Sequence, residues 1–123
     1  VIMNNQTVDI FNPKTIRATM GSIFRVPFVY VPDLAPVLEQ MHAKGIHTYA
    51  AHLKGQEYYD SFSFREPTAF LIGNEGNGLS REISDQAGQY LKIPMEGRVE
   101  SLNASIAAAL LMYEAHRQRS ASL

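Results

Sequence analysis

The sequence predicts an α/β protein whose sheet is mostly parallel and is flanked by helices. Short apolar runs alternate with helical stretches along its 123 residues, a pattern typical of parallel strands joined by helices. Two of the apolar runs lead into polar loops that begin about twenty residues apart. The length is enough for one small domain with a hydrophobic core.

The first half of the chain contains two predicted helices. Asn12 followed by Pro13 indicates a helix N-cap with proline at the first helical position, and we expect that helix to end near Phe24. Asp33 is placed to cap a second helix that runs through Met41. Buried strands are expected at residues 28–31 and 46–51.

The second half predicts two more strands and two more helices. A polar and aromatic stretch, residues 54–66, predicts a short helical turn within a loop. Strands are expected at residues 68–72 and 90–93, and helices at residues 80–87 and 103–119. In the last helix the apolar residues with helical spacing are Ile106, Leu110 and Tyr113, and those expected to face water are Glu114, Arg117 and Gln118.

The composition excludes several kinds of site. The chain has no cysteine, so it has no disulfide, no thiolate metal ligand and no cysteine nucleophile, which fits a reducing cytoplasm. The formal net charge is −1, so the charge of the whole chain does not point to a nucleic-acid partner. No apolar run approaches the length of a membrane span.

Positive charge is concentrated in one segment of this nearly neutral chain. The interval between Asp9 and Asp33 holds no acidic residue. It contains three cations, Lys14, Arg17 and Arg25. These side chains predict contacts with RNA phosphates. The alternative is an ordinary helix surface that faces solvent.

The loop after the strand at residues 68–72 holds three glycines and one carboxylate. Its spacing, G-x-x-G-x-G, differs from the dinucleotide fingerprint, and no Lys-Ser/Thr pair follows, which excludes a nucleotide-phosphate cradle. Glu75 lies between glycines at the carboxyl end of a strand, where open α/β sheets usually bind ligands. The alternative is a tight turn at Asn77 and Gly78, with Glu75 facing solvent.

A second strand-to-loop junction, residues 93–105, follows this one. Ser101 and Asn103 precede the last helix, and a role as N-cap accounts for one of them but not for both. The N–H groups at the start of that helix would also suit a polar ligand. Two polar loops that leave strand ends predict one binding crevice built from both.

The histidines do not predict a metal site. His42, His47 and His52 recur every five residues, which matches neither a helix face nor a strand face. They also lack carboxylate or cysteine partners nearby in the sequence.

Together these segments resemble the SpoU/TrmH branch of the SPOUT RNA methyltransferases. Residues 70–80 resemble the second motif of that family, and residues 93–108 resemble its third. The upstream segment, residues 8–27, is similar to a region that follows the first motif. We therefore interpret residues 1–123 as a SpoU/TrmH-type methyltransferase domain that lacks its first motif.

The resemblance implies a SPOUT-type fold with a deep C-terminal trefoil knot and a bound S-adenosylmethionine (AdoMet). By motif position, the cofactor-binding residues would be Gly73, Asn74, Gly78, Leu79, Ile93, Met95 and Leu102. The family also implies a homodimer formed through the knot region, with no membrane partner and no metal.

The implied reaction is methyl transfer to a ribose 2′-hydroxyl of rRNA or tRNA. The hydroxyl is the weak partner in this reaction, and it needs positioning and a proton acceptor. The residues that match the polar catalytic positions of the family are Glu75, Ser101 and Asn103.

The chain departs from the family at the first motif, roughly N-x-G-x-x-x-R. Residues 12–17 imitate it, but they lack the glycine and are one residue too short, so Arg17 does not take its role. Because the chain begins at Val1, we expect that motif and a substrate-binding domain to precede it in a longer protein. Two alternatives remain open: a non-catalytic knotted RNA-binding module, and a small α/β ligand-binding domain unrelated to RNA.

Overall fold

A computed structural model describes residues 1–74, 77–98 and 102–121. The predicted α/β class with parallel strands is confirmed. The chain divides into two compact units, residues 1–36 and residues 37–123. Among the described residues, no helix combines the length and the apolar character needed to cross a membrane.

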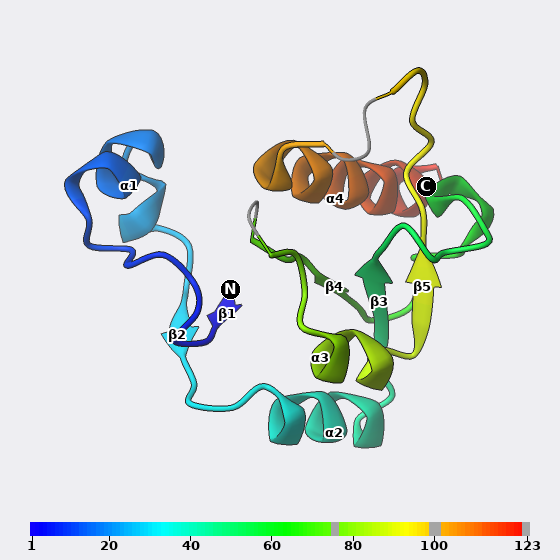
Figure 1. Ribbon diagram of the computed structural model, residues 1–123, viewed down its shortest axis with the longest axis horizontal. Coiled ribbons are helices and arrows are strands. Elements are labelled where there is room, and N and C mark those ends of the chain that lie inside the picture. The colour runs from blue at the N-terminus through cyan, green and yellow to red at the C-terminus, as the bar shows by residue number, and fades with distance from the viewer. Residues whose placement is uncertain (75–76, 99–101, 122–123) are drawn as a thin grey trace. The chain divides into compact units, whose positions relative to one another are not determined.

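The first unit contains a short parallel pair of strands, β1 (Ile2–Met3) and β2 (Val29–Tyr30) (Figure 1). The Tyr30 hydroxyl accepts the Ile10 N–H at 2.9 Å and donates to the Val8 carbonyl at 3.0 Å, which ties the intervening segment to β2. The prediction of a buried strand here is wrong, since the two residues of β2 are 50% and 40% exposed. A pair of two-residue strands cannot cover both of its own faces.

Helix α1 (Pro13–Ala18) begins where the sequence predicts but ends earlier. The Asn12 side chain accepts a backbone N–H of the first turn at 2.9 Å. Met20 and Gly21 have φ angles of +48° and +86°, which a right-handed helix cannot contain. A separate 3₁₀ turn, η1 (Ser22–Phe24), therefore replaces the predicted last turn of the helix.

Helix α2 (Ala35–Ala43) has the predicted start and end signals. The Asp33 carboxylate accepts the Ala35 N–H at 3.0 Å. Gly45, with a φ of +75°, follows the helix and allows the chain to turn into the next strand.

The second unit is built on a three-stranded parallel sheet with the order β4-β3-β5. β3 (His47–Ala51) lies between β4 (Thr68–Leu71) and β5 (Gln89–Leu91). The 3₁₀ turn η2 (Tyr59–Ser61) lies in the predicted loop between β3 and β4, and α3 (Arg81–Gln86) connects β4 to β5. Because the strands run in one direction, their carboxyl ends meet at one edge.

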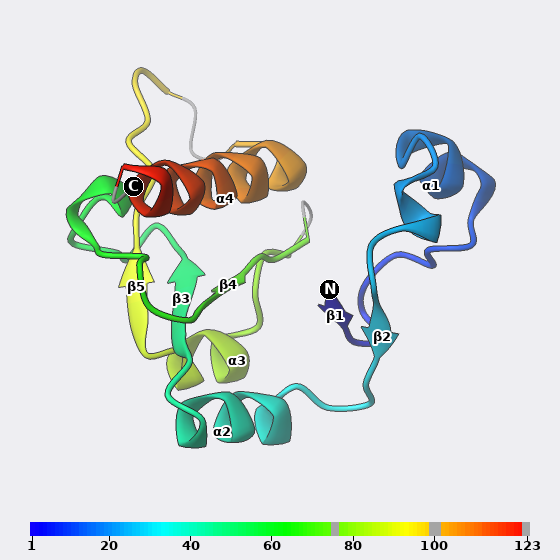
Figure 2. The ribbon, with the colours of Figure 1, turned by 180° about the vertical axis from the view of Figure 1, so that it is seen from behind.

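Helix α4 (Ala104–Ser120) packs on one face of this sheet and α2 on the other. Tyr49 of β3 shares a core cluster with Leu111 of α4, whereas the neighbouring Thr48 bonds to His42 of α2 at 2.7 Å. Successive strand residues face opposite sides of a sheet, so these contacts place the two helices on opposite faces. Figure 2 shows, as Figure 1 does, that α4 lies toward the arrowhead ends of β3 and β5.

The core of the second unit is largely aromatic. Four rings meet with centroid distances between 5.0 and 6.4 Å, and they belong to Tyr49, Phe62, Phe64 and Phe70. Most of these pairs are edge-to-face, the arrangement that aromatic quadrupoles favour. The loop between β3 and β4 supplies two of the rings, which fixes that loop against the sheet.

The buried side of α4 differs from the predicted one. The buried residues of the helix are Leu111, Ala115 and Gln118, while Ile106 and Tyr113 are 57% and 73% exposed. Gln118 was expected to face water. Its amide instead accepts the Phe64 N–H at 2.6 Å and donates to the Phe62 carbonyl at 2.9 Å. These bonds satisfy backbone groups of the loop before β4, which is why a polar side chain is buried there.

Candidate functional site

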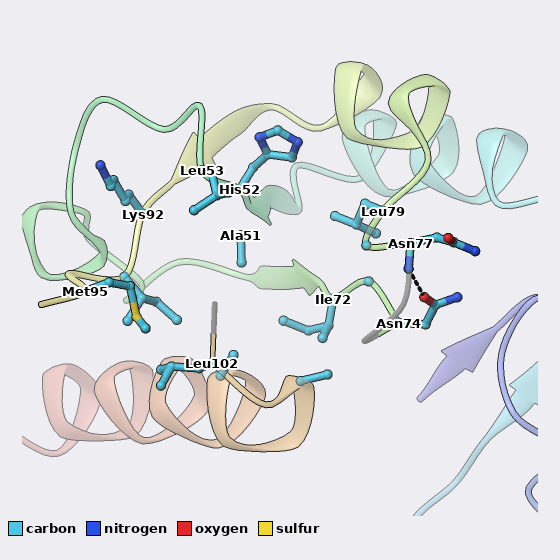
Figure 3. Close-up of a pocket in the computed structure, with 15 residues that line it drawn as sticks. Ala51, His52, Leu53, Ile72, Asn74, Asn77, Leu79, Lys92, Met95 and Leu102 are labelled. Carbon is cyan, nitrogen blue, oxygen red and sulfur yellow. Dashed lines mark hydrogen bonds between the residues drawn. The ribbon is translucent and has the colours of Figure 1, made fainter. Parts of the chain in front are cut away.

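A cavity of about 390 Å³ opens at the carboxyl edge of the three-stranded sheet (Figure 3). Three of its walls are the segments at the ends of β3, β4 and β5, and the fourth is the start of α4. The described residues that line it are Ala51, His52, Leu53, Ile72, Gly73, Asn74, Asn77, Gly78, Leu79, Lys92, Ile93, Met95, Leu102, Ala104 and Ala107.

Gly73 allows the loop after β4 to fold back on itself. A Cβ at this position would lie 2.2 Å from both the Gly78 carbonyl carbon and the Leu79 nitrogen. The Gly78 N–H donates to the Asn74 carbonyl at 2.9 Å, and the Asn77 N–H donates to Asn74 Oδ1 at 2.7 Å. The segment is therefore a tight turn and a cavity wall at once, so these two interpretations of the loop do not exclude each other.

The wall after β5 is anchored by the loop that follows β3. The Lys92 N–H donates to the Glu57 carbonyl, and the Lys92 carbonyl accepts the Tyr59 N–H, both at 2.9 Å. Beyond this anchor, Ile93 and Met95 are half-buried and line the cavity. The backbone that carries them is thus fixed before it enters the loop.

The start of α4 is positioned by its cap. Asn103 Oδ1 accepts the N–H groups of Ser105 and Ile106 at 2.9 and 3.3 Å, an arrangement that satisfies the first turn of the helix. Two lining residues, Leu102 and Ala104, flank the cap. The cap therefore determines where these two residues meet the cavity.

The lining is mainly apolar. Its larger apolar side chains are Leu53, Ile72, Leu79, Ile93, Met95 and Leu102. Lys92 is the charged residue among the described lining residues, and Figure 3 shows its amine at the rim, pointing away from Ala51 and Leu102. Such a lining suits a ligand with flat apolar faces whose polar edge is met by backbone groups.

Comparison with known proteins assigns the chain to a family. The family model described as SpoU rRNA Methylase matches residues 1–113. The chain belongs to the SpoU rRNA methylase family. YacO of Bacillus subtilis, which is assigned to the TrmH family of tRNA/rRNA methyltransferases, is 39% identical over 103 residues, 84% of this chain and 41% of YacO. The chain thus spans about two fifths of the length of the curated relatives it matches.

Solved structures of SpoU methyltransferases share the fold. The SpoU methyltransferase AviRb from Streptomyces viridochromogenes, in complex with the cofactor AdoMet, is 36% identical with a TM-score of 0.87. That alignment covers 96% of this chain and 46% of AviRb. An RNA 2′-O ribose methyltransferase is 32% identical with a TM-score of 0.83, over 97% of this chain and 45% of that protein. The predicted SpoU/TrmH resemblance is confirmed.

The structure brings together every residue that the SpoU resemblance assigned to the cofactor. All of them line the one cavity: Gly73, Asn74, Gly78, Leu79, Ile93, Met95 and Leu102. Of the predicted catalytic residues, Asn103 caps α4 between two lining residues. Glu75 and Ser101 lie outside the described residues. The knot prediction involves the same two loops and stays a prediction.

The predicted RNA-binding residues of this SpoU chain lie in the first unit. Lys14, Arg17 and Arg25 are all exposed. Arg17 Nε donates to the Pro13 carbonyl at 3.3 Å. Within the part of the chain that the structure describes, none of the three forms an ion pair. Both interpretations of the segment, a solvated surface and an RNA contact, agree with these facts.

His52 lines the cavity, and sequence reasoning considered it only as a metal ligand. Its Nδ1 accepts the Lys54 N–H at 3.0 Å, and its ring packs against Tyr90 with a centroid distance of 5.3 Å. The Tyr90 hydroxyl donates to Asp85 at 2.6 Å, and this bond raises the pKa of Tyr90. The described residues contain no group of three or more His, Cys, Asp or Glu placed to bind a metal ion.

Proposed function

We propose that this chain provides the AdoMet pocket of an RNA 2′-O-ribose methyltransferase. The observation that carries the proposal is the single cavity lined by three strand ends and the start of α4. The proposal is supported by the family to which the chain belongs and by the AdoMet complex of the similar protein AviRb. It is also supported by a second similar structure, which is named as an RNA 2′-O ribose methyltransferase. Residues 1–123 would belong to one methyltransferase domain.

The residues that line the cavity fit AdoMet. A volume of about 390 Å³ falls in the usual range for small-molecule sites. Ile93, Met95 and Leu102 offer apolar surfaces for the faces of an adenine ring, and the glycines Gly73 and Gly78 expose backbone groups for its polar edge. When bound there, AdoMet supplies an electrophilic methyl group on a positively charged sulfur.

The chain's own contribution to the reaction is to hold and orient the two reactants. A ribose hydroxyl is a weak nucleophile, so its position relative to the methyl group governs the rate. We assign this positioning to Glu75, Ser101 and Asn103. The cap hydrogen bonds hold the Asn103 side chain against the first turn of α4, so its position is set by the start of that helix.

The substrate in this proposal is rRNA or tRNA. Lys14, Arg17 and Arg25 would contact its phosphates, since they are exposed and have no ion-pair partner among the described residues. The proposal includes a cytoplasmic location, where rRNA and tRNA substrates occur.

A homodimer and a trefoil knot belong to the same proposal. α4 leaves Ile106 and Tyr113 exposed, with exposed fractions of 57% and 73%, and their spacing of seven residues places them on one side of the helix. Packing this side against a second copy of the chain would remove both side chains from water. In the knot, the C-terminal helix would be threaded through a loop of the chain.

Titration calorimetry with AdoMet and with its demethylated product tests the proposal. Both ligands should bind the parent chain, and Leu102→Asp should weaken binding at least about tenfold, because it buries an unpaired charge beside the adenine. Val8→Asp is the control, since Val8 is exposed and is not among the residues that line the cavity.

Two outcomes would contradict the proposal. Unchanged affinity in Leu102→Asp would show that the pocket is placed wrongly. If the chain binds RNA but gives no detectable heat with AdoMet, the alternative is favoured, namely a non-catalytic knotted RNA-binding module. The three exposed cations are consistent with that alternative.

A further inference from the structure

The first unit has an exposed tip whose apolar side chains have no role in the proposed methyl transfer. The tip consists of residues 19–25, where the backbone turns through Met20 and Gly21, both with positive φ. The side chains of Met20 and Phe24 are each 87% exposed, the largest fraction of any large hydrophobic side chain in the described residues. A partner that covers these two side chains would remove their apolar surface from water, which is favourable.

Hydrogen bonds on both sides hold the tip in this conformation. The Ser22 N–H donates to the Thr19 carbonyl at 2.9 Å, and the Phe24 N–H donates to the Gly21 carbonyl at 3.1 Å. A left-handed backbone is unfavourable for a residue with a side chain, so Met20 keeps its φ of +48° against local strain. Strain that the surrounding bonds maintain is characteristic of functional segments.

The tip and the helix before it carry positive charge. Arg25 is the last residue of the tip, and its Nη2 would be 3.7 Å from a Cβ placed on Gly21. Lys14 and Arg17 are exposed on the preceding helix α1. No acidic residue occurs from residue 10 to residue 32, and none of the three cations forms an ion pair with a described residue. The tip therefore combines an exposed aromatic ring with positive charge that has no ion-pair partner.

We propose that this tip binds an unpaired nucleotide of RNA, with the Phe24 ring stacked on the base and Arg25 on a neighbouring phosphate. The inference rests on the proposed function, which makes RNA the substrate. Every base offers a flat face to an aromatic ring, but a base inside a duplex is already stacked on both sides, so the tip selects single strands. An apolar partner surface would leave the cations without counter-charges, and charge is depleted in the cores of protein interfaces.

Fluorescence anisotropy with the full chain tests this. The probes are a labelled oligouridine about 12 nucleotides long and an RNA duplex of the same length. The single strand should bind more tightly. Phe24→Leu keeps the apolar bulk but removes the flat ring, and should weaken single-strand binding about tenfold, whereas Phe24→Tyr should retain it. Arg25→Gln should reduce the slope of log affinity against log salt by about one.

Phe11→Leu is the matched control. Phe11 belongs to the same unit and is 62% exposed, but its ring packs edge-to-face on Phe28 at 6.1 Å, and RNA affinity should change less than about twofold. Because Phe24 is exposed, its variants should melt at the parent temperature.

Three results would overturn the inference. The first is that Phe24→Leu and the parent bind RNA with equal affinity. The second is that the parent binds the single strand and the duplex with equal affinity. The third is that Phe24→Leu changes the oligomeric state, which would assign the tip to contacts with a second copy of the chain. No tip residue lines the cavity, and the AdoMet titration uses other variants, so a failure of this inference can be distinguished from a failure of the proposed function.

Discussion

Gly73→Ala adds one methyl group to the cavity wall at a point where there is no space. The new Cβ would lie 2.2 Å from backbone atoms of Gly78 and Leu79, and ordinary contact begins at 3.4 Å. The two sides of the turn would have to separate by about 1.2 Å, the difference between these distances. The 2.9 Å bond from the Gly78 N–H to the Asn74 carbonyl cannot keep its geometry through such a shift.

We expect the free energy of unfolding to fall by about 2–4 kcal/mol. Overpacking of this kind costs about 1–3 kcal/mol, and a lost backbone hydrogen bond adds about 1 kcal/mol. For a chain of this length, that corresponds to a drop in Tm of about 10 °C. AdoMet affinity should fall as well, because the displaced atoms line the cavity. Thermal unfolding by circular dichroism and titration calorimetry measure the two effects.

Gly78→Ala is the control for Gly73→Ala, because it introduces backbone strain in the same loop without a steric clash. Gly78 has a φ of +64°, but a Cβ there would meet no atom within 4 Å. Its cost should be limited to the left-handed penalty of about 1–2 kcal/mol, with the wall intact. If Gly73→Ala melts within about 2 °C of the parent and binds AdoMet equally well, the close approach at Gly73 is wrong.

Three further predictions concern the last helix. Gln118→Ala leaves the buried Phe64 N–H without its acceptor and should cost about 1–3 kcal/mol in urea unfolding; a cost below about 0.5 kcal/mol would contradict the burial argument. Hydrogen bonds from Arg117 and Gln118 lower the pKa of Glu114 from 4.5 to about 2, so its stabilising effect is complete above about pH 5 and is lost as the pH falls toward 2. The decline of Tm over that range should be smaller in Glu114→Gln than in the parent, and equal declines would refute the pairing. Asn103→Ala should lose about 1 kcal/mol of stability, whereas Asn103→Asp keeps the cap. In the full-length protein, loss of methyl transfer in both variants would support a positioning role, and normal transfer in Asn103→Asp would leave only the cap.

Three of the four cavity walls could be predicted from local sequence. The loop after β4 is marked by its glycines, and the segment between β5 and α4 is marked by its polar residues. The wall at the end of β3, residues 51–53, contains neither signal. It follows only from the general rule that parallel strands end at a common edge, applied to the strand predicted at residues 46–51. His52 and Leu53 were missed for that reason.

Helix starts were predictable because their interactions are local. Asn12, Asp33 and Asn103 each bond to backbone groups only two or three residues ahead. The buried side of α4 was not predictable, because the burial of Gln118 depends on a partner 54 residues earlier in the chain. The left-handed Met20 was equally hidden, since methionine has no preference for that conformation.

No short stretch of the chain contains the cavity, since its lining extends from Ala51 to Ala107. The strand ends and the start of α4 enclose the cavity only when that helix is packed on the sheet. A ligand seated there would contact the helix and the ends of all three strands at once. Because it would bind the folded form and not the unfolded one, its binding energy would add directly to the stability of this packing.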